Sequence, residues 1–215
     1  MTRQRRKDEV FYITTVVFLV EDTLFRLPRG PFVDQSAFFR QRILQRAPEI
    51  VKPGGSSDDV PFHLESIEKD DFKQLLKVLF PPRPVNATDA PQTYSEWAAV
   101  LKLSTKWGFE NARQQAIDQM ESMSIDPIDK ICLARDYDVD EWLAPAVNDL
   151  VKREEPINVN DVDRLGLEFA LKVAAIRERV ANHPSASLQI GDRQVEHLDF
   201  TSSVAAMLVS IDMAS

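Results

Sequence analysis

The chain of 215 residues is 44% hydrophobic, which is enough to bury one large core or two small ones, so we expect a folded protein. Acidic residues outnumber basic ones by 34 to 26, and the net charge of -8 argues against direct binding to nucleic acid or to anionic membranes. With one cysteine and no run typical of a signal peptide or a membrane span, we expect an intracellular protein of the cytoplasm, the nucleus or both.

Residues 1–9 are predicted to be a flexible, basic N-terminus. Its positive charges form a short run of Arg3, Arg5, Arg6 and Lys7. Such a run is typical of a chain end exposed to solvent, and it also fits a nuclear address or an electrostatic arm. We expect the first of these.

The first regular structure predicted along the chain is a β-hairpin. Residues 16–20, VVFLV, are rich in β-branched and aromatic side chains and too few for a stable helix. Residues 23–27 alternate apolar and polar side chains, as a half-buried strand does. Glu21 and Asp22 lie between the two runs and form the predicted turn.

Two short helices, a loop and a third strand are predicted next. The helices cover about 31–36 and 37–46, where apolar residues recur at roughly helical spacing. Residues 52–59, KPGGSSDD, are mostly turn formers, and because no Gly-Lys-Ser/Thr follows the glycines we expect an exposed loop and no phosphate site. The strand covers 60–64.

Three helices with one apolar face each are predicted in the middle of the chain. The first covers about 68–80, and its stripe consists of Phe72, Leu75, Leu76 and Leu79. Four prolines in 81–92 predict an irregular connection. The second helix covers about 94–107, and Gly108 is expected to end it in the left-handed conformation. The third has an apolar face of Ala112, Ala116, Met120 and Met123.

The following half of the chain predicts only helices. One covers 128–137, after a break at Asp126 and Pro127. The next has Leu143, Ala146, Val147 and Leu150 on one face, and Pro145 inside it is expected to bend or delay its first turn. The last begins at Asn160 as N-cap, and its apolar positions are Val162, Leu165, Phe169 and Val173.

Residues 181–215 form a tail of different character. Gly191 and Asp192 lie between apolar residues and predict the turn of a hairpin. A small apolar helix is predicted beyond it, with a stripe of Val204, Met207, Leu208 and Ile211. An apolar stripe needs cover, so the tail either packs on the helical half or offers a contact patch.

The order of these elements resembles the BTB/POZ fold, an α+β fold in which helices surround a small sheet. Residues 22–28, DTLFRLP, resemble the second strand of that family and its exit. Residues 36–40, SAFFR, resemble its serine, two spacers and phenylalanine, and residues 103–108, LSTKWG, its helix junction. Residues 133–139 and 164–168 are similar to the helical extension of BTB proteins from mushroom-forming fungi.

The resemblance implies a BTB/POZ domain over 10–124, an all-α, BACK-like extension over 125–180 and the tail over 181–215. It implies a non-enzymatic protein–protein interaction module that acts as a scaffold or adaptor. The more specific expectation is a substrate adaptor of a cullin ubiquitin ligase. The alternative is a BTB-type transcriptional regulator in the nucleus, which the basic N-terminus would suit.

The resemblance also implies where partners bind. Tyr94, Ser95 and Glu96 fit the pattern of a hydrophobic residue, any residue and glutamate by which some BTB adaptors contact a cullin. The same tripeptide is also an ordinary helix start with an acid in its first turn. Dimers of the family use the first strand and first helix, so Phe11, Tyr12 and Phe32 are the candidates for self-association.

No cofactor, metal or small-molecule substrate is expected. Cys132 lies between apolar neighbours and is expected to be a buried small hydrophobe, because nothing near it would activate a thiolate. Adjacent acids at 58–59, 70–71 and 154–155 are expected to be solvated. The pattern of metal-site spacings is missing among His63, His183, His197 and Cys132.

Overall fold

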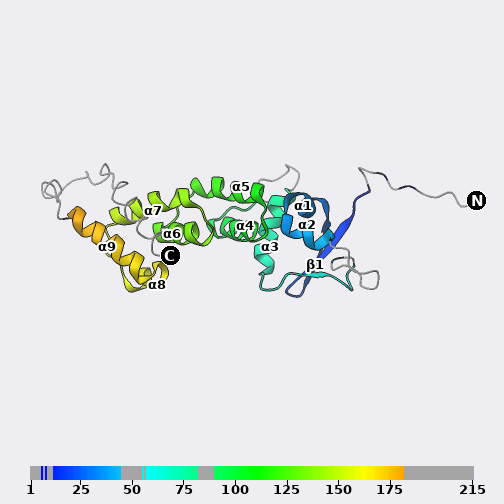
Figure 1. The fold of residues 1–215 in the computed structure, drawn as a ribbon, viewed down its shortest axis with the longest axis horizontal. Coiled ribbons are helices and arrows are strands. Elements are labelled where there is room, and N and C mark those ends of the chain that lie inside the picture. Colours follow the sequence, from blue (N-terminus) through cyan, green and yellow to red (C-terminus); the bar gives the residue numbers. More distant parts are fainter. Residues whose placement is uncertain are drawn as a thin grey trace, which may run out of the picture. The chain divides into compact units, whose positions relative to one another are not determined.

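The chain divides into two compact units, Met1–Met123 and Ser124–Ser215. The computed structural model describes residues 6, 8, 12–44, 55, 57–81 and 90–181. Over these residues the fold is mixed α+β and mostly helical, with a three-stranded sheet in the first unit and helices alone in the second (Figure 1). The α+β class predicted from the sequence is confirmed. Ala181, the expected first residue of the tail, instead ends the last described helix, and the hairpin and helix expected in the rest of the tail, 182–215, lie outside the described residues.

The predicted hairpin is confirmed and forms most of the sheet. Strand β1, Thr15–Val20, pairs antiparallel with β2, Thr23–Pro28, in a register that sets Val20 opposite Thr23. The third strand, β3, is shorter than expected and covers only Phe62–His63. It runs parallel to β1 on the side away from β2, so the strand order is β2-β1-β3.

Gly55 explains why the loop before β3 contains glycine. The Gly55 carbonyl oxygen accepts a hydrogen bond of 3.0 Å from the backbone nitrogen of Val17. A β-carbon at Gly55 would lie 2.6 Å from Cγ2 of Val16, and its φ of +85° also disfavours other residues. The backbone at Gly55 can therefore approach β1 this closely because the position has no side chain.

Over the described residues of the first unit, five helices agree with the predicted ones to within a few residues. They are α1 Gly30–Gln35, α2 Ala37–Leu44, α3 Lys69–Leu79, α4 Tyr94–Trp107 and α5 Glu110–Glu121. Gly108 has the expected left-handed conformation, with φ of 67°, and the backbone nitrogen of Phe109 donates to the Ser104 carbonyl oxygen. Glycine therefore ends α4 and lets α5 turn back along it. Residues 45–46 and 82–89 of the predicted elements lie outside the described part.

An aromatic cluster forms the core of the first unit. Phe18 of β1 lies at its centre and is fully buried. Its ring centroid lies 4.7 to 5.8 Å from those of Phe32, Phe39, Phe62 and Phe72. Phe39 continues the cluster to the end of α4, with its centroid 5.2 Å from that of Trp107. Tilted and edge-to-face rings at these separations attract one another beyond the area that they bury.

A buried serine joins α1 and α2 to the end of α4. The Ser36 hydroxyl donates to the Trp107 carbonyl oxygen at 2.6 Å and accepts from the Phe39 backbone nitrogen at 3.2 Å. The first bond satisfies a carbonyl at the C-terminus of α4, and the second caps the start of α2. Within residues 36–40, Ser36 therefore fixes the start of α2 and with it the position of Phe39 in the aromatic cluster.

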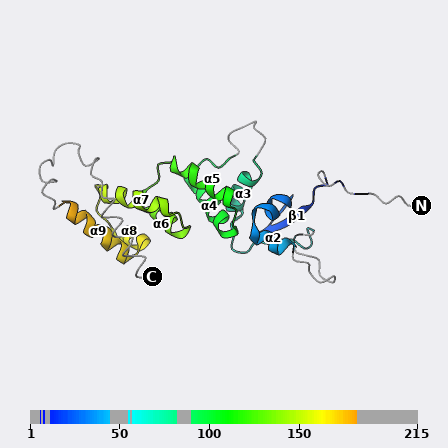
Figure 2. The same ribbon diagram turned by 45° about the horizontal axis from the view of Figure 1, so that its top comes forward.

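The second unit consists of helices over its described residues, as the sequence predicts. They are α6 Pro127–Asp136, α7 Asp140–Lys152, α8 Val159–Leu165 and α9 Leu167–Ala181. Their inner faces form one hydrophobic core that includes Ile131, Val147, Leu150, Phe169 and Val173. Figure 2 shows α8 and α9 beside the pair α6 and α7, whose helices pack on each other.

Three expectations for these helices differ from the structure. Pro145 was expected to bend or delay the first turn of α7, and the delay is wrong, because the helix begins at Asp140 and Pro145 lies in its second turn. The single helix expected from Asn160 is two helices, since Gly166, with φ of 83°, separates α8 from α9. The N-cap of α8 is Asn158 and not Asn160, which lies inside the helix. The Asn158 side chain accepts from the Asp161 backbone nitrogen, while the Asp161 carboxylate accepts from the Asn158 backbone nitrogen.

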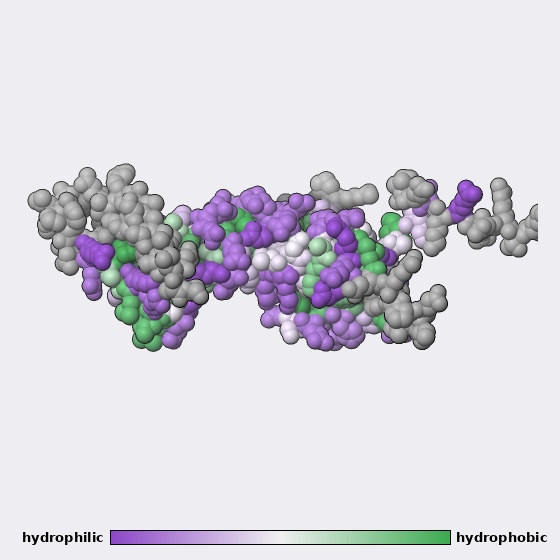
Figure 3. Space-filling model, viewed as in Figure 1, coloured by the Kyte–Doolittle hydropathy of each residue, from purple (hydrophilic) through white to green (hydrophobic). Residues whose placement is uncertain are grey.

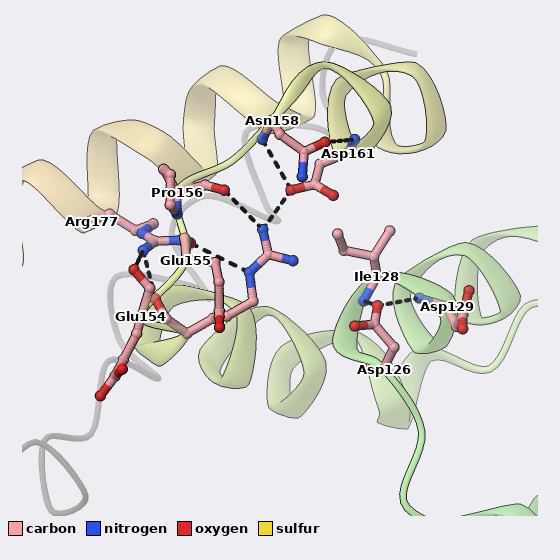
Figure 4. Close-up of polar contacts among 10 residues, drawn as sticks. Asp126, Ile128, Asp129, Glu154, Glu155, Pro156, Asn158, Asp161 and Arg177 are labelled. Atoms are coloured by element: carbon pink, nitrogen blue, oxygen red, sulfur yellow. Dashed lines mark hydrogen bonds and ion pairs between the residues drawn. The ribbon is translucent and has the colours of Figure 1, made fainter.

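Two arginines hold the connection between α7 and α8 (Figure 4). Arg177 of α9 donates to the Arg153 carbonyl oxygen at 2.5 Å and to the Glu155 carbonyl oxygen at 2.8 Å. Arg153 in turn donates to the Asp161 carboxylate at 2.5 Å. Burial acts to raise the pKa of Asp161, but the bonds from Arg153 and the Asn158 backbone outweigh it and lower that pKa. The ionised carboxylate is therefore part of the folded second unit.

We predict that Ser36→Ala lowers the free energy of unfolding by roughly 1 to 3 kcal/mol, because it leaves buried backbone groups without their partner. Chemical denaturation measures this loss. Ser122→Ala is the matched control, since the Ser122 hydroxyl also donates to a carbonyl oxygen, that of Gln119, but at an exposed position. Equal losses in the two variants would contradict the role assigned to Ser36.

We predict that Asp161→Asn lowers the free energy of unfolding at pH 7 by roughly 2 to 4 kcal/mol, because it leaves Arg153 without its buried carboxylate. Because the pKa of Asp161 is lower in the folded state than in the unfolded chain, its carboxylate stabilises the fold at pH values above the unfolded pKa of about 3.9. This contribution is lost as the pH falls through the lower pKa of the folded state. The gap between wild type and variant should therefore narrow as the pH is lowered toward 2.

Denaturation curves at several pH values measure this gap. Asp163→Asn is the control, because Asp163 is an exposed acid of the same helix. A gap between wild type and Asp161→Asn that stays constant down to acid pH would show that the carboxylate does not act through its charge.

Candidate protein-interaction site

The tripeptide that resembles a cullin-binding motif forms the first turn of α4. Thr93 is the N-cap, and its hydroxyl accepts from the Glu96 backbone nitrogen at 3.3 Å. The Glu96 carboxylate oxygen Oε2 accepts from the backbone nitrogens of Gln92 at 2.7 Å and Thr93 at 3.1 Å. Both halves of a capping box are therefore present.

Glu96 is held in place by this cap. The two backbone hydrogen bonds lower the pKa of its carboxyl group, so the side chain is ionised at neutral pH. The second oxygen, Oε1, lies 3.8 Å from Nζ of Lys77 on α3. Oε2 thus caps the first turn of α4, while Oε1 faces Lys77, and both side chains of this pair are partly exposed. Tyr94, the first residue of α4, is half-buried.

The three residues expected at a dimer surface differ in position. Phe11 lies outside the described residues. Tyr12 is 52% exposed, and Ile13 beside it is 70% exposed. The Arg29 backbone nitrogen donates to the Thr14 carbonyl oxygen at 2.9 Å, so the chain before β1 runs next to the start of α1.

Phe32 requires a correction, because it has no exposed surface with which to meet a partner. It is fully buried, and its ring centroid lies 4.7 Å from that of Phe18. Helical spacing placed Phe32 on the apolar face of a short helix. It could not show whether that face packs inside the unit or lies on its surface. Phe32 therefore belongs to the core of the first unit.

A hollow that the sequence did not indicate lies at the end of the sheet. Its volume is about 540 Å³. The turn after β1 and the segment from β3 to α3 line it, with apolar Leu19, Leu64 and Ile67, polar His63 and Ser66, and acidic Glu21, Glu65 and Glu68. Glu21 and Ser66 have positive φ angles of 53° and 58°, so two tight turns shape the rim. We call it the sheet-end hollow; its mixed lining suits contact with an apolar or basic side chain.

Over the described residues, no three histidine, cysteine or acidic side chains form a group that could hold a metal ion. His63 and Ser66 line the same hollow, but no hydrogen bond joins them within the described part of the chain. Cys132 is half-buried, its thiol donates to the Arg164 carbonyl oxygen at 3.7 Å, and burial raises its pKa. The thiol is therefore protonated at neutral pH.

The paired acids of the first unit engage lysines and an arginine. Asp58 lies 2.8 Å from Arg26, and Asp70 lies 2.8 Å from Lys73. Asp71 lies 2.8 Å from Lys102 of α4. Each of these three carboxylates thus has a cation as partner. Asp58 and Asp70 are exposed, as expected, whereas the Asp71 side chain is only 21% exposed and is not the solvated acid that was expected. In the second unit, Glu154 and Glu155 are exposed.

Comparison of the sequence with protein-family models gives no match, and comparison with curated proteins gives none either. Among the described residues no helix has the length and apolarity needed to cross a bilayer. Any functional assignment therefore depends on the order of the elements and on the residues described above.

Proposed function

We propose that residues 10–124 form a BTB/POZ domain and that residues 125–180 form a BACK-like extension. The chain then works without catalysis, as a scaffold or adaptor that binds other proteins. Its more specific form is a substrate adaptor of a cullin ubiquitin ligase. In both forms the partners are proteins, including a second copy of the chain.

The observation that carries this proposal is the order and topology of the first unit. A hairpin is followed by two short helices, and a third strand then pairs parallel with the first on the side away from the second. A helix and then a helical pair joined through Gly108 complete the unit. This order of elements is the one that the resemblance to BTB/POZ domains implies.

The Ser36 contacts add physical support. The serine and phenylalanine of residues 36–40 are the positions that the resemblance singled out. In this chain the serine caps α2 and bonds to the end of α4, while Phe39 packs in the aromatic cluster. Both residues thus have a structural reason to occur at this spacing.

A cullin contact at α4 is compatible with the geometry of Glu96. One carboxylate oxygen bonds to the cap and thereby fixes the Glu96 side chain. A partner that binds Glu96 therefore loses little free energy to the ordering of that side chain. The other oxygen can exchange its contact with Lys77 for a cation or donor of a partner. Tyr94 supplies apolar surface in the same turn.

Capture of purified cullin by the full chain tests this contact. We predict that Glu96→Gln lowers the affinity by roughly tenfold, because glutamine keeps the capping box but removes the charge. Glu96→Lys should abolish capture. Glu110→Gln, an exposed acid in the first turn of α5, is the control and should bind as the wild type does. If Glu96→Lys captures as much cullin as the wild type, the motif is ruled out.

Light scattering over a concentration series tests self-association. We predict a particle of twice the 24.5 kDa monomer mass at micromolar concentration. Tyr12→Arg should weaken the dimer by at least about tenfold, because it sets a charge at the expected apolar contact before β1. Val159→Arg, at an exposed apolar position of the second unit, should leave it unchanged. A wild-type monomer at high micromolar concentration would remove the dimer from the proposal.

A further inference from the structure

Helix α9 is apolar on two faces, although a surface helix normally needs only one apolar face. The inner face is buried in the core of the second unit and consists of Phe169, Ala170, Val173 and Ile176. On the opposite face, Leu167 is 64% exposed and Leu171 is 60% exposed. Ala174 and Ala175 continue this face by one more turn, partly buried and exposed respectively. We call Leu167, Leu171, Ala174 and Ala175 the outer stripe.

The outer stripe belongs to a region where hydrophobic side chains reach the surface. Figure 3 shows such side chains gathered over α8 and the start of α9. Val159, the first residue of α8, is 75% exposed. The charged pair of Lys172 and Glu168, 2.8 Å apart, flanks the stripe on one side. Apolar surface of this kind, with a polar border, is typical of a site that another element covers.

The C-terminal tail has an apolar stripe of matching spacing. Val204, Leu208 and Ile211 follow one another at i, i+4 and i+7, as Leu167, Leu171 and Ala174 do on α9. Residues 204–209, VAAMLV, are all apolar, and Asp212 is the only charged residue from 201 to 215. Alanines on α9 allow a second helix to approach closely.

The chain between the two stripes is long enough to bring them together. Twenty-two residues, 182–203, separate the end of α9 from Val204. A flexible chain of that length has a root-mean-square span of about 26 Å. Leu171 lies ten residues before Ala181, which is about 15 Å along the helix. The tail can therefore fold back on α9, and the short tether gives it an effective concentration in the millimolar range.

We propose that residues 204–211 form a helix whose apolar stripe docks on the outer stripe of α9 in the same chain. The tail then completes the second unit by covering Leu167 and Leu171. This contact does not depend on the BTB assignment, since it rests on the second unit and the tail alone.

Hydrogen exchange of the full chain tests the docking. Backbone amides of 204–211 should exchange at least about tenfold more slowly than those of an unstructured peptide. The double variant Leu167→Gln and Leu171→Gln should return them to within about twofold of the unstructured rate, while the exchange of α6 and α7 stays unchanged. Leu24→Gln, at an exposed leucine of β2, is the control. Fast exchange in the wild type, or protection that survives in the double variant, would overturn the proposal.

Disulfide trapping in a Cys132→Ser background provides a second measurement. Unlike the glutamine variant, it detects the docked contact directly and does not require the contact to be disrupted. Leu171→Cys with Leu208→Cys should form a bond within one chain. Leu171→Cys with Val209→Cys should not, since position 209 lies on the other side of the predicted helix. Equal trapping of both pairs would overturn the docking geometry. Trapping between chains, or protection that rises with protein concentration, would show that a second copy covers the stripe and would overturn the proposal.

Discussion

The bonds made by the buried hydroxyl of Ser36 are the constraint on which the first unit depends. One of them, to the Trp107 carbonyl oxygen, links two residues 71 positions apart in the chain, and the entropic cost of closing so long a loop must be offset by burial elsewhere. The aromatic cluster provides that burial, since the same two points place Phe39 against Trp107. Neither part suffices alone. Without the aromatic rings the Ser36 hydroxyl would be exposed to water. Without that hydroxyl the Trp107 carbonyl oxygen at the end of α4 would be buried with no hydrogen-bond donor.

Local patterns predicted most of the elements, because each is decided by residues close in sequence. The hairpin follows from two apolar runs around Glu21 and Asp22, and Gly108 ends α4 as expected. Gly166 has the same kind of positive φ, but it lies inside a continuous apolar period, so one helix was expected where two occur. The capping box of Asn158 and Asp161 was the signal for the true start of α8.

The site was less predictable, because it depends on contacts between distant residues. Sequence placed Glu96 in a first turn but could not tell that Lys77 of another helix faces its second oxygen. It could not assign Phe32 to the core, since burial is decided by what packs on a face. The sheet-end hollow arises from two turns brought together only by the parallel pairing of β1 and β3. The outer stripe of α9 could not be predicted, because apolar residues lie on both faces of this helix and the sequence does not show which of them are exposed.

The bonds from Arg177 to the carbonyl oxygens of Arg153 and Glu155 have a consequence for truncation. This guanidinium neutralises the negative C-terminal end of α7 from a position near the far end of α9. A stop codon or a protease cut before residue 177 would remove the cation together with only the last five residues of α9. The shortest stable version of the second unit must therefore extend beyond this arginine, although most of its hydrophobic core lies earlier in the chain.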